Sequence, residues 1–139
     1  MDNRNNFTEE FALKNGKIQP PWGSDFFIFP KTMDIDFPPF LVGRPYWDNW
    51  MIYYFRKNKI PVIDITDYAL VFHQNHDYEH VPKSTGHKWE GPEADHNKTL
   101  IKEIIGHIHP FNLRDVNHTL SKNGLVLKKT NFRILSFDL

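Results

Sequence analysis

Residues 47–58 constrain the fold more than any other part of the sequence. Large side chains recur there at positions i, i+3, i+4, i+7 and i+8, which lie on one side of an α-helix (Trp47, Trp50, Met51, Tyr54 and Phe55). Asn58 continues the row, whereas Asn49 falls outside it. The late positive charges of Arg56 and Lys57 suit a helix C-terminus, and Pro61 stops the helix. The pattern predicts a helix that buries one broad face.

Shorter elements are predicted on both sides of this helix. The predicted helices cover 7–15 and 91–105, and the predicted strands cover 26–29, 61–66, 68–73 and a terminal pair or hairpin within 124–137. Residues 31–45 and 74–95 have the composition of loops, and 112–115 of a turn. The length of 139 residues and the lack of internal repeats predict a single domain, residues 1–139, of mixed α and β class.

Composition excludes several classes of partner. Seventeen basic and seventeen acidic residues cancel, so no net field recruits nucleic acid or an anionic membrane. There is no cysteine, which rules out a disulfide framework and a cysteine-based zinc site. No run approaches the roughly 20 apolar residues that cross a bilayer, and the polar, acidic N-terminus is unlike a signal peptide. We therefore expect a soluble, cytoplasmic protein.

Asp48 stands between two tryptophans at the start of the central predicted helix. The simpler interpretation is a capping or first-turn acid that stabilises the helix end. The alternative is a working acid, because Tyr46, Trp47 and Trp50 would surround it with rings of the type that stack on sugars. Such a carboxylate could accept a proton from an acceptor hydroxyl, and the rings would raise its pKa by desolvation. The sequence leaves both interpretations open.

Other polar clusters carry weaker signals. His73 and His76 come at the end of a predicted strand at a spacing compatible with metal ligation, although this spacing alone is a weak signal and hydrogen-bonded structural histidines are the simpler explanation. The acidic pair Asp34 and Asp36 could hold Mg²⁺ or Mn²⁺, or could simply lie in a loop. Asp25, together with the preceding serine, could contact substrate hydroxyls or close a turn. No glycine-rich phosphate loop or nucleophile elbow supports hydride transfer or acyl-serine chemistry.

The order of these segments resembles the C-terminal, acceptor-side half of nucleotide-sugar glycosyltransferases of the GT-A type. The similarity is closest to a set of bacterial glycosyltransferase-like proteins and spans about residues 18–100. The segments that carry it are "GSDFFIF", "PPFLVGRPYWDNW", "PVIDIT", "HQNHDYEH" and "GPEADHN". The resemblance implies an incomplete GT-A-like domain, with short strands packed against two or three helices.

The same resemblance assigns roles to individual residues. It implies Asp48 as the catalytic base of a hexosyltransferase, and His73 or His76 as a ligand of a divalent metal (Mn or Mg) or a contact of the donor diphosphate. The substrate-binding residues that it implies are Asp25, Arg44, Trp47, Asn49 and Trp50. In an inverting enzyme of this type, the base deprotonates the acceptor hydroxyl, which attacks the anomeric carbon of the nucleotide-sugar donor.

The chain departs from the family pattern in one respect. A complete GT-A enzyme has a nucleotide-binding half with an acidic D-x-D metal motif, for which this sequence has no room, and Asp34 and Asp36 lie in the wrong place to supply that motif. We therefore expect a partner chain to supply that half and the isolated polypeptide to be inactive. Two alternatives stay open: a non-enzymatic module that binds carbohydrate or protein through its aromatic surface, and a metal-dependent hydrolase using His73, His76 and Asp77.

Overall fold

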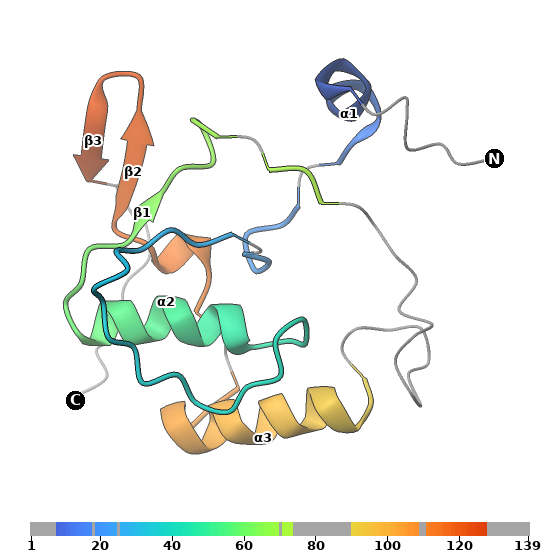
Figure 1. Ribbon diagram of the computed structural model, residues 1–139, viewed down its shortest axis with the longest axis vertical. Helices are drawn as coiled ribbons and strands as arrows, with labels where there is room; N and C mark the ends of the chain where they lie inside the picture. The colour runs from blue at the N-terminus through green and yellow to red at the C-terminus, as the bar shows by residue number, and fades with distance from the viewer. Residues whose placement is uncertain are drawn as a thin grey trace.

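A computed structural model describes residues 8–17, 19–24, 26–69, 71–73, 90–108 and 111–127. The described part has mixed α and β structure, as the sequence predicts (Figure 1). Its elements are α1 (Glu9–Asn15), α2 (Trp47–Lys57), β1 (Ile63–Asp64), α3 (Pro92–Ile105), the 3₁₀ helix η2 (Leu113–Asp115), β2 (His118–Ser121) and β3 (Gly124–Leu127). No helix in the described ranges is long and apolar enough to cross a membrane.

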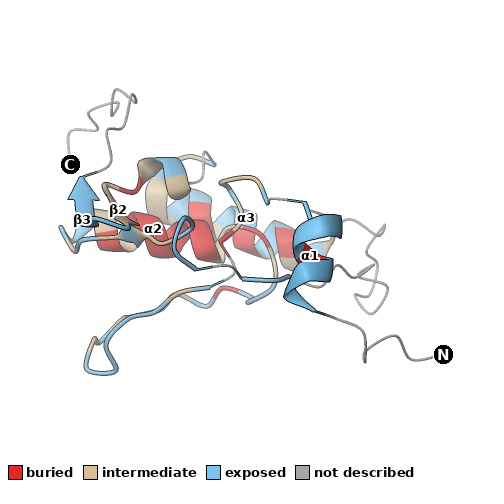
Figure 2. Cartoon of the chain, turned by 90° about the horizontal axis from the view of Figure 1, so that it is seen from above, coloured by how far each residue is buried: buried red, intermediate tan, exposed pale blue. Residues whose placement is uncertain are grey.

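Helix α2 is the centre of the hydrophobic core. Seven of its eleven residues are buried, so the prediction of one buried face was too narrow. The ring of Phe37 packs on Trp50 at 5.1 Å between centroids, and Phe111 packs on Tyr53 at 5.3 Å. Ile101 of α3 belongs to the same cluster of buried side chains. Because neighbours cover several of its sides, α2 is buried along most of its length, as the red ribbon in Figure 2 shows.

The ends of the two long helices follow known capping rules. Lys59 adopts φ 57° after α2, and the amide of Ile60 donates to the carbonyl of Phe55 at 2.8 Å. Together with the bond from Lys59 N to Arg56 O at 3.1 Å, this forms a Schellman motif. Helix α3 begins at Pro92 and is followed by Gly106 at φ 87°. Its sequence thus places proline and glycine where helices favour them.

The small sheet has the order β1-β2-β3. Ile63 of β1 pairs with His118 of β2 in a parallel arrangement, whereas β2 and β3 form an antiparallel hairpin. Of the terminal pair or hairpin predicted within 124–137, residues 124–127 form β3, which pairs with the unpredicted strand His118–Ser121, and residues 128–137 lie outside the described residues. Gly124 adopts φ 101° at the start of β3, a backbone conformation that favours glycine.

Two predicted strands are not found in the described residues. Residues 26–29 and 68–73, where described, carry no strand, because no other described strand pairs with them. Residues 26–42 instead run as an irregular segment, hereafter the arm, which lies in front of α2 in Figure 1. The arm reverses direction at a turn in which the amide of Met33 donates to the carbonyl of Pro30 at 2.9 Å.

The Schellman motif yields a stability prediction. Lys59→Gly should raise the free energy of unfolding by about 0.5–1 kcal/mol, because glycine adopts positive φ without the steric cost of a side chain. Urea denaturation followed by circular dichroism measures the change. Lys57→Gly, within the last turn of α2, is the control and should lower stability by a similar amount. A destabilised Lys59→Gly variant would contradict the positive φ at this position.

Candidate functional site

Asp48 lies in the first turn of α2 and holds a distant segment of the chain. Its side chain is buried, and Oδ2 accepts a hydrogen bond from the backbone amide of Ser24 at 3.1 Å. It does not cap its own helix, because the N-cap position belongs to Tyr46, which makes no side-chain cap bond. The carboxylate therefore joins the start of α2 to the segment that leads into the arm.

Tyr46 is the strained residue at this end of α2. Its φ of 79° lies in the left-handed region. This conformation is unfavourable for any residue other than glycine, because the Cβ atom crowds the backbone. Desolvation by burial raises the pKa of the Tyr46 hydroxyl above its ordinary value. A tyrosine hydroxyl is already neutral at physiological pH, so this shift only extends the pH range in which Tyr46 stays protonated.

Asn49, like Asp48, binds backbone of segments that are distant in the sequence. Its side-chain amide donates to the carbonyl of Phe111 at 2.5 Å and to the carbonyl of Trp22 at 3.4 Å. Both acceptors belong to irregular backbone, whose carbonyl groups need partners when they are withdrawn from water. The adjacent Trp50 is 3% exposed and lies in the core. The polar pair between the two tryptophans thus binds backbone of segments distant in the sequence.

Helix α3 holds the other end of the arm. Asn97 is fully buried, and its side chain donates to the carbonyls of Leu41 and Pro45 at 3.0 and 2.9 Å. Its Oδ1 accepts from the amide of Leu41 at 2.9 Å. The preceding residue of α3, His96, has its Nε2 2.9 Å from the carbonyl of Pro39. The arm is therefore fixed to α2 near residue 24 and to α3 at residues 39–45.

Arg44 links the segment before α2 to the first turn of α3 through an ion pair. Its Nε lies 2.6 Å from Oε2 of Glu93, in an ion pair whose arginine side chain is mostly buried. The segments "GRPYWDNW" and "GPEADHN" thus contact each other directly. Sequence reasoning overlooked Asn97. A signal was present, since Asn97 follows Ala94 by three residues and precedes Ile101 by four, on the buried face of α3.

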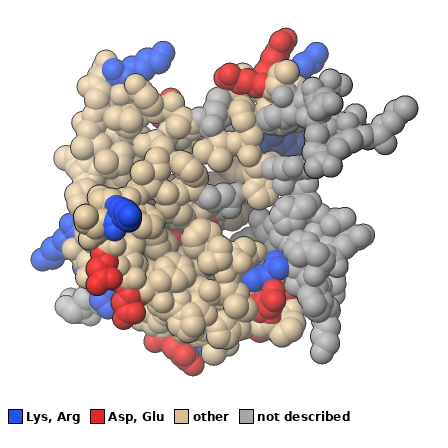
Figure 3. All heavy atoms as spheres, in the orientation of Figure 1, with Lys and Arg blue, Asp and Glu red and all other residues tan. Residues whose placement is uncertain are grey.

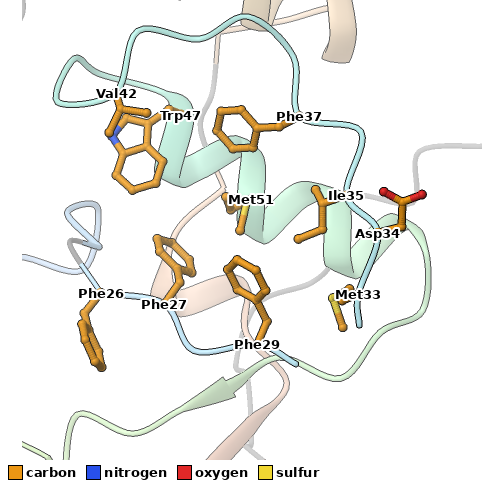
Figure 4. Close-up of a pocket in the computed structure, with 10 residues that line it drawn as sticks. All are labelled: Phe26, Phe27, Phe29, Met33, Asp34, Ile35, Phe37, Val42, Trp47 and Met51. Carbon is orange, nitrogen blue, oxygen red and sulfur yellow. The ribbon is translucent and has the colours of Figure 1, made fainter. Parts of the chain in front are cut away.

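An open groove of about 610 Å³ lies between the arm and α2 (Figure 4). Its lining consists of Phe26, Phe27, Phe29, Met33, Asp34, Ile35, Phe37, Val42, Trp47 and Met51. The rings of Phe27 and Trp47 meet edge to face, with centroids 5.8 Å apart. In Figure 4 the side chains of Phe29, Ile35 and Phe37 point into the hollow. The groove therefore presents several aromatic surfaces to a ligand.

The acidic pair lies on the outer side of the arm. Met33 and Ile35 are half-buried, whereas Asp34 and Asp36 are exposed, as expected for an extended segment with one apolar face. Figure 4 shows the Asp34 carboxylate turned away from the hollow. Among the described residues, no group of three or more His, Cys, Asp or Glu side chains is placed to hold a metal ion.

The predicted site residues do not converge on one pocket in the described structure. Trp47 lines the groove, Trp50 lies in the core, Asp48 and Asn49 are buried bracing residues, Arg44 is ion-paired and His73 is exposed. Asp25, His76 and Asp77 lie outside the described residues. Of the two tryptophans predicted for the site, only Trp47 lines the groove, and the polar residues Asp48 and Asn49 of α2 bind backbone of distant segments.

Substitution of Asp48 tests this positioning role. Asp48→Ala should lower the free energy of unfolding by about 2–3 kcal/mol, because the buried amide of Ser24 loses a charged acceptor. Asp48→Asn retains an oxygen acceptor and should cost only about 1 kcal/mol. Urea denaturation monitored by tryptophan fluorescence provides both values. If Asp48→Ala is as stable as the wild type, the carboxylate does not hold the arm.

Asn97→Ala should lower the free energy of unfolding more than Asp48→Ala does. It removes three hydrogen bonds in a fully buried site and should cost about 2–4 kcal/mol. Asn58→Ala is a matched control, since the exposed Asn58 amide bonds only the carbonyl of Tyr54 and should matter by less than about 1 kcal/mol. Equal effects of the two substitutions in urea denaturation would rule out Asn97 as the main anchor of the arm.

Comparisons with protein-family models, with curated proteins and with solved structures found no match for this chain. The functional interpretation therefore depends on the residues and geometry of the chain itself.

Proposed function

We propose that this domain is the acceptor-side part of a nucleotide-sugar-dependent glycosyltransferase, with the aromatic groove as its acceptor surface. One observation supports this best: Phe27 of "GSDFFIF" and Trp47 of "WDNW" meet on the wall of an open groove. These are two of the five segments that carry the resemblance to acceptor-side domains, and Phe27 and Trp47 are 20 residues apart in the sequence. Their rings are suited to stack on the apolar faces of a sugar.

The arm supplies groups for the polar part of a sugar. No helix or strand occupies residues 26–42, so the backbone amides and carbonyls there are not committed to a ladder. Such groups can exchange hydrogen bonds with the hydroxyls of a ligand, as polar groups do in mostly apolar binding sites. The groove thus combines stacking surfaces with a hydrogen-bonding rim.

In the transfer step a base takes the proton of the acceptor hydroxyl, the oxygen attacks the anomeric carbon of the donor sugar, and the bond from that carbon to the nucleotide diphosphate breaks. A base must lie within about 2.6–3.2 Å of the hydroxyl that it deprotonates. Asp48, which the resemblance implies as the base, is buried, accepts from the Ser24 amide and does not line the groove, so the proposal gives it the role of holding the arm. A nucleotide-binding half, in a partner chain or another part of the protein, would hold the donor.

A second candidate function is a non-enzymatic binding module. Nine of the ten residues that line the groove are apolar, and Asp34 is the single exception. A sugar usually requires more side-chain hydrogen bonds than one acid provides, whereas an aromatic or aliphatic side chain of a peptide does not. This observation favours an apolar peptide as the ligand if the groove has no carbohydrate partner.

Methionine labelling distinguishes the two functions. Of the three methionines, Met33 and Met51 line the groove, and Met1 lies outside the described residues. An acceptor oligosaccharide from a glycan screen should shift the ¹³C-methyl resonances of Met33 and Met51 in the full chain. Trp47→Ala should weaken this binding at least about tenfold, since a stacked ring contributes roughly 1–3 kcal/mol.

Trp22→Ala is the matched control, because Trp22 is 48% exposed and does not line the groove. It should bind the oligosaccharide as the wild type does. If no oligosaccharide shifts the two methionines but an apolar peptide does, the transferase proposal is wrong and the binding module is supported.

A further inference from the structure

The groove between the arm and α2 is large enough for a sugar but has few polar side chains. Its volume of about 610 Å³ lies within the range of about 300–1,000 Å³ that small-molecule pockets have. Asp34 is the single charged residue of its lining, and its carboxylate turns away from the hollow (Figure 4). A polar group of a ligand that finds no partner in such a site loses free energy on leaving water. The few donors and acceptors of the groove therefore select the ligand.

The indole N–H of Trp47 is a donor at one end of the groove. Trp47 is half-buried, and no group in the described part of the chain accepts a hydrogen bond from its Nε1. An indole nitrogen donates and does not accept, so its partner must be an acceptor. In Figure 4 the nitrogen lies beside Val42, which also lines the groove and is 69% exposed. This end of the groove thus places one donor beside one aliphatic surface.

We propose that the groove is specific for a sugar that carries an N-acetyl group, an inference that rests on the acceptor function proposed above. The acetamido carbonyl accepts the hydrogen bond from Trp47 Nε1, and the acetamido methyl group packs on Val42. The acetamido N–H donates to a backbone carbonyl of the arm, which belongs to no strand. The sugar ring lies against the aromatic wall, where Phe27 meets Trp47 edge to face.

A hydroxyl in place of the acetamido group fits this end of the groove less well. A hydroxyl accepts a hydrogen bond from Nε1, but its own hydrogen also needs an acceptor. The neighbouring side chain of Val42 provides none. An amide carbonyl carries no hydrogen, and its methyl group suits an apolar neighbour. The site therefore distinguishes an acetamido substituent from a hydroxyl.

An unacetylated amino sugar is disfavoured by its charge. An ammonium group only donates, and a carboxylate is its strongest partner. Asp34 faces outward, and Asp48 accepts from the Ser24 amide and does not line the groove. The arm crosses in front of α2 in the view of Figures 1 and 3, and the central part of this face carries few charged side chains (Figure 3). Among the described residues, the hollow thus contains no counter-ion for such a cation.

Titration of the full chain with three disaccharides of the same linkage tests the proposal. Diacetylchitobiose carries acetamido groups, cellobiose has hydroxyls in their place, and deacetylated chitobiose carries ammonium groups in slightly acidic buffer. Diacetylchitobiose should bind at least about tenfold more tightly than either of the others, since a neutral hydrogen bond and a buried methyl group together contribute about that factor. In ¹⁵N-labelled protein it should also shift the indole N–H resonance of Trp47.

Trp47→Phe keeps an aromatic ring on the wall of the groove and removes the donor. The preference for diacetylchitobiose over cellobiose should fall at least about threefold, because only the methyl contact remains. The missing resonance of this variant also identifies the Trp47 indole signal. Trp22→Phe is the matched control, because Trp22 does not line the groove, and it should keep the wild-type preference. Circular dichroism shows whether both variants are folded.

The outcomes separate this specificity from the acceptor function on which it rests. Cellobiose or the amine binding as tightly as diacetylchitobiose would overturn the specificity and leave the acceptor groove supported. A preference that survives Trp47→Phe in full would overturn it as well. If only oligosaccharides without an N-acetyl group shift Met33 and Met51, the specificity is wrong and the acceptor function remains. If no oligosaccharide shifts them, both are wrong.

Discussion

Hydrogen bonds from helix side chains to irregular backbone are the interactions on which the described structure depends. Residues 26–45 contain no helix or strand, so their backbone groups lack regular partners. Asn97 reproduces part of a strand ladder, since its amide both donates to and accepts from the backbone of Leu41. Asp48 similarly accepts a hydrogen bond from the backbone amide of Ser24. Buried polar side chains in α2 and α3 thus replace the sheet that would otherwise order this segment.

The groove is a consequence of these two anchors. One holds the chain just before the arm and the other holds it where the arm ends, so the intervening residues must span the face of α2. Extended segments place alternate side chains on one face, which directs Met33, Ile35 and Phe37 toward α2 and leaves Asp34 and Asp36 in solvent. Loss of either anchor would release the wall of the groove, although neither anchor lines it. Residues that shape the site are therefore distinct from those that would touch a ligand.

Local patterns predicted the helices well and the pairings poorly. The apolar spacing of residues 47–55 identified α2, and the helix predicted over 91–105 corresponds to α3. The strand His118–Ser121 was missed although its hairpin partner β3 follows directly, whereas its parallel pairing with Ile63, 55 residues away, has no local signal. The same limit applies to the site. "WDNW" was recognised as special, but the sequence does not reveal that Asp48 binds Ser24 or that Trp50 lies in the core.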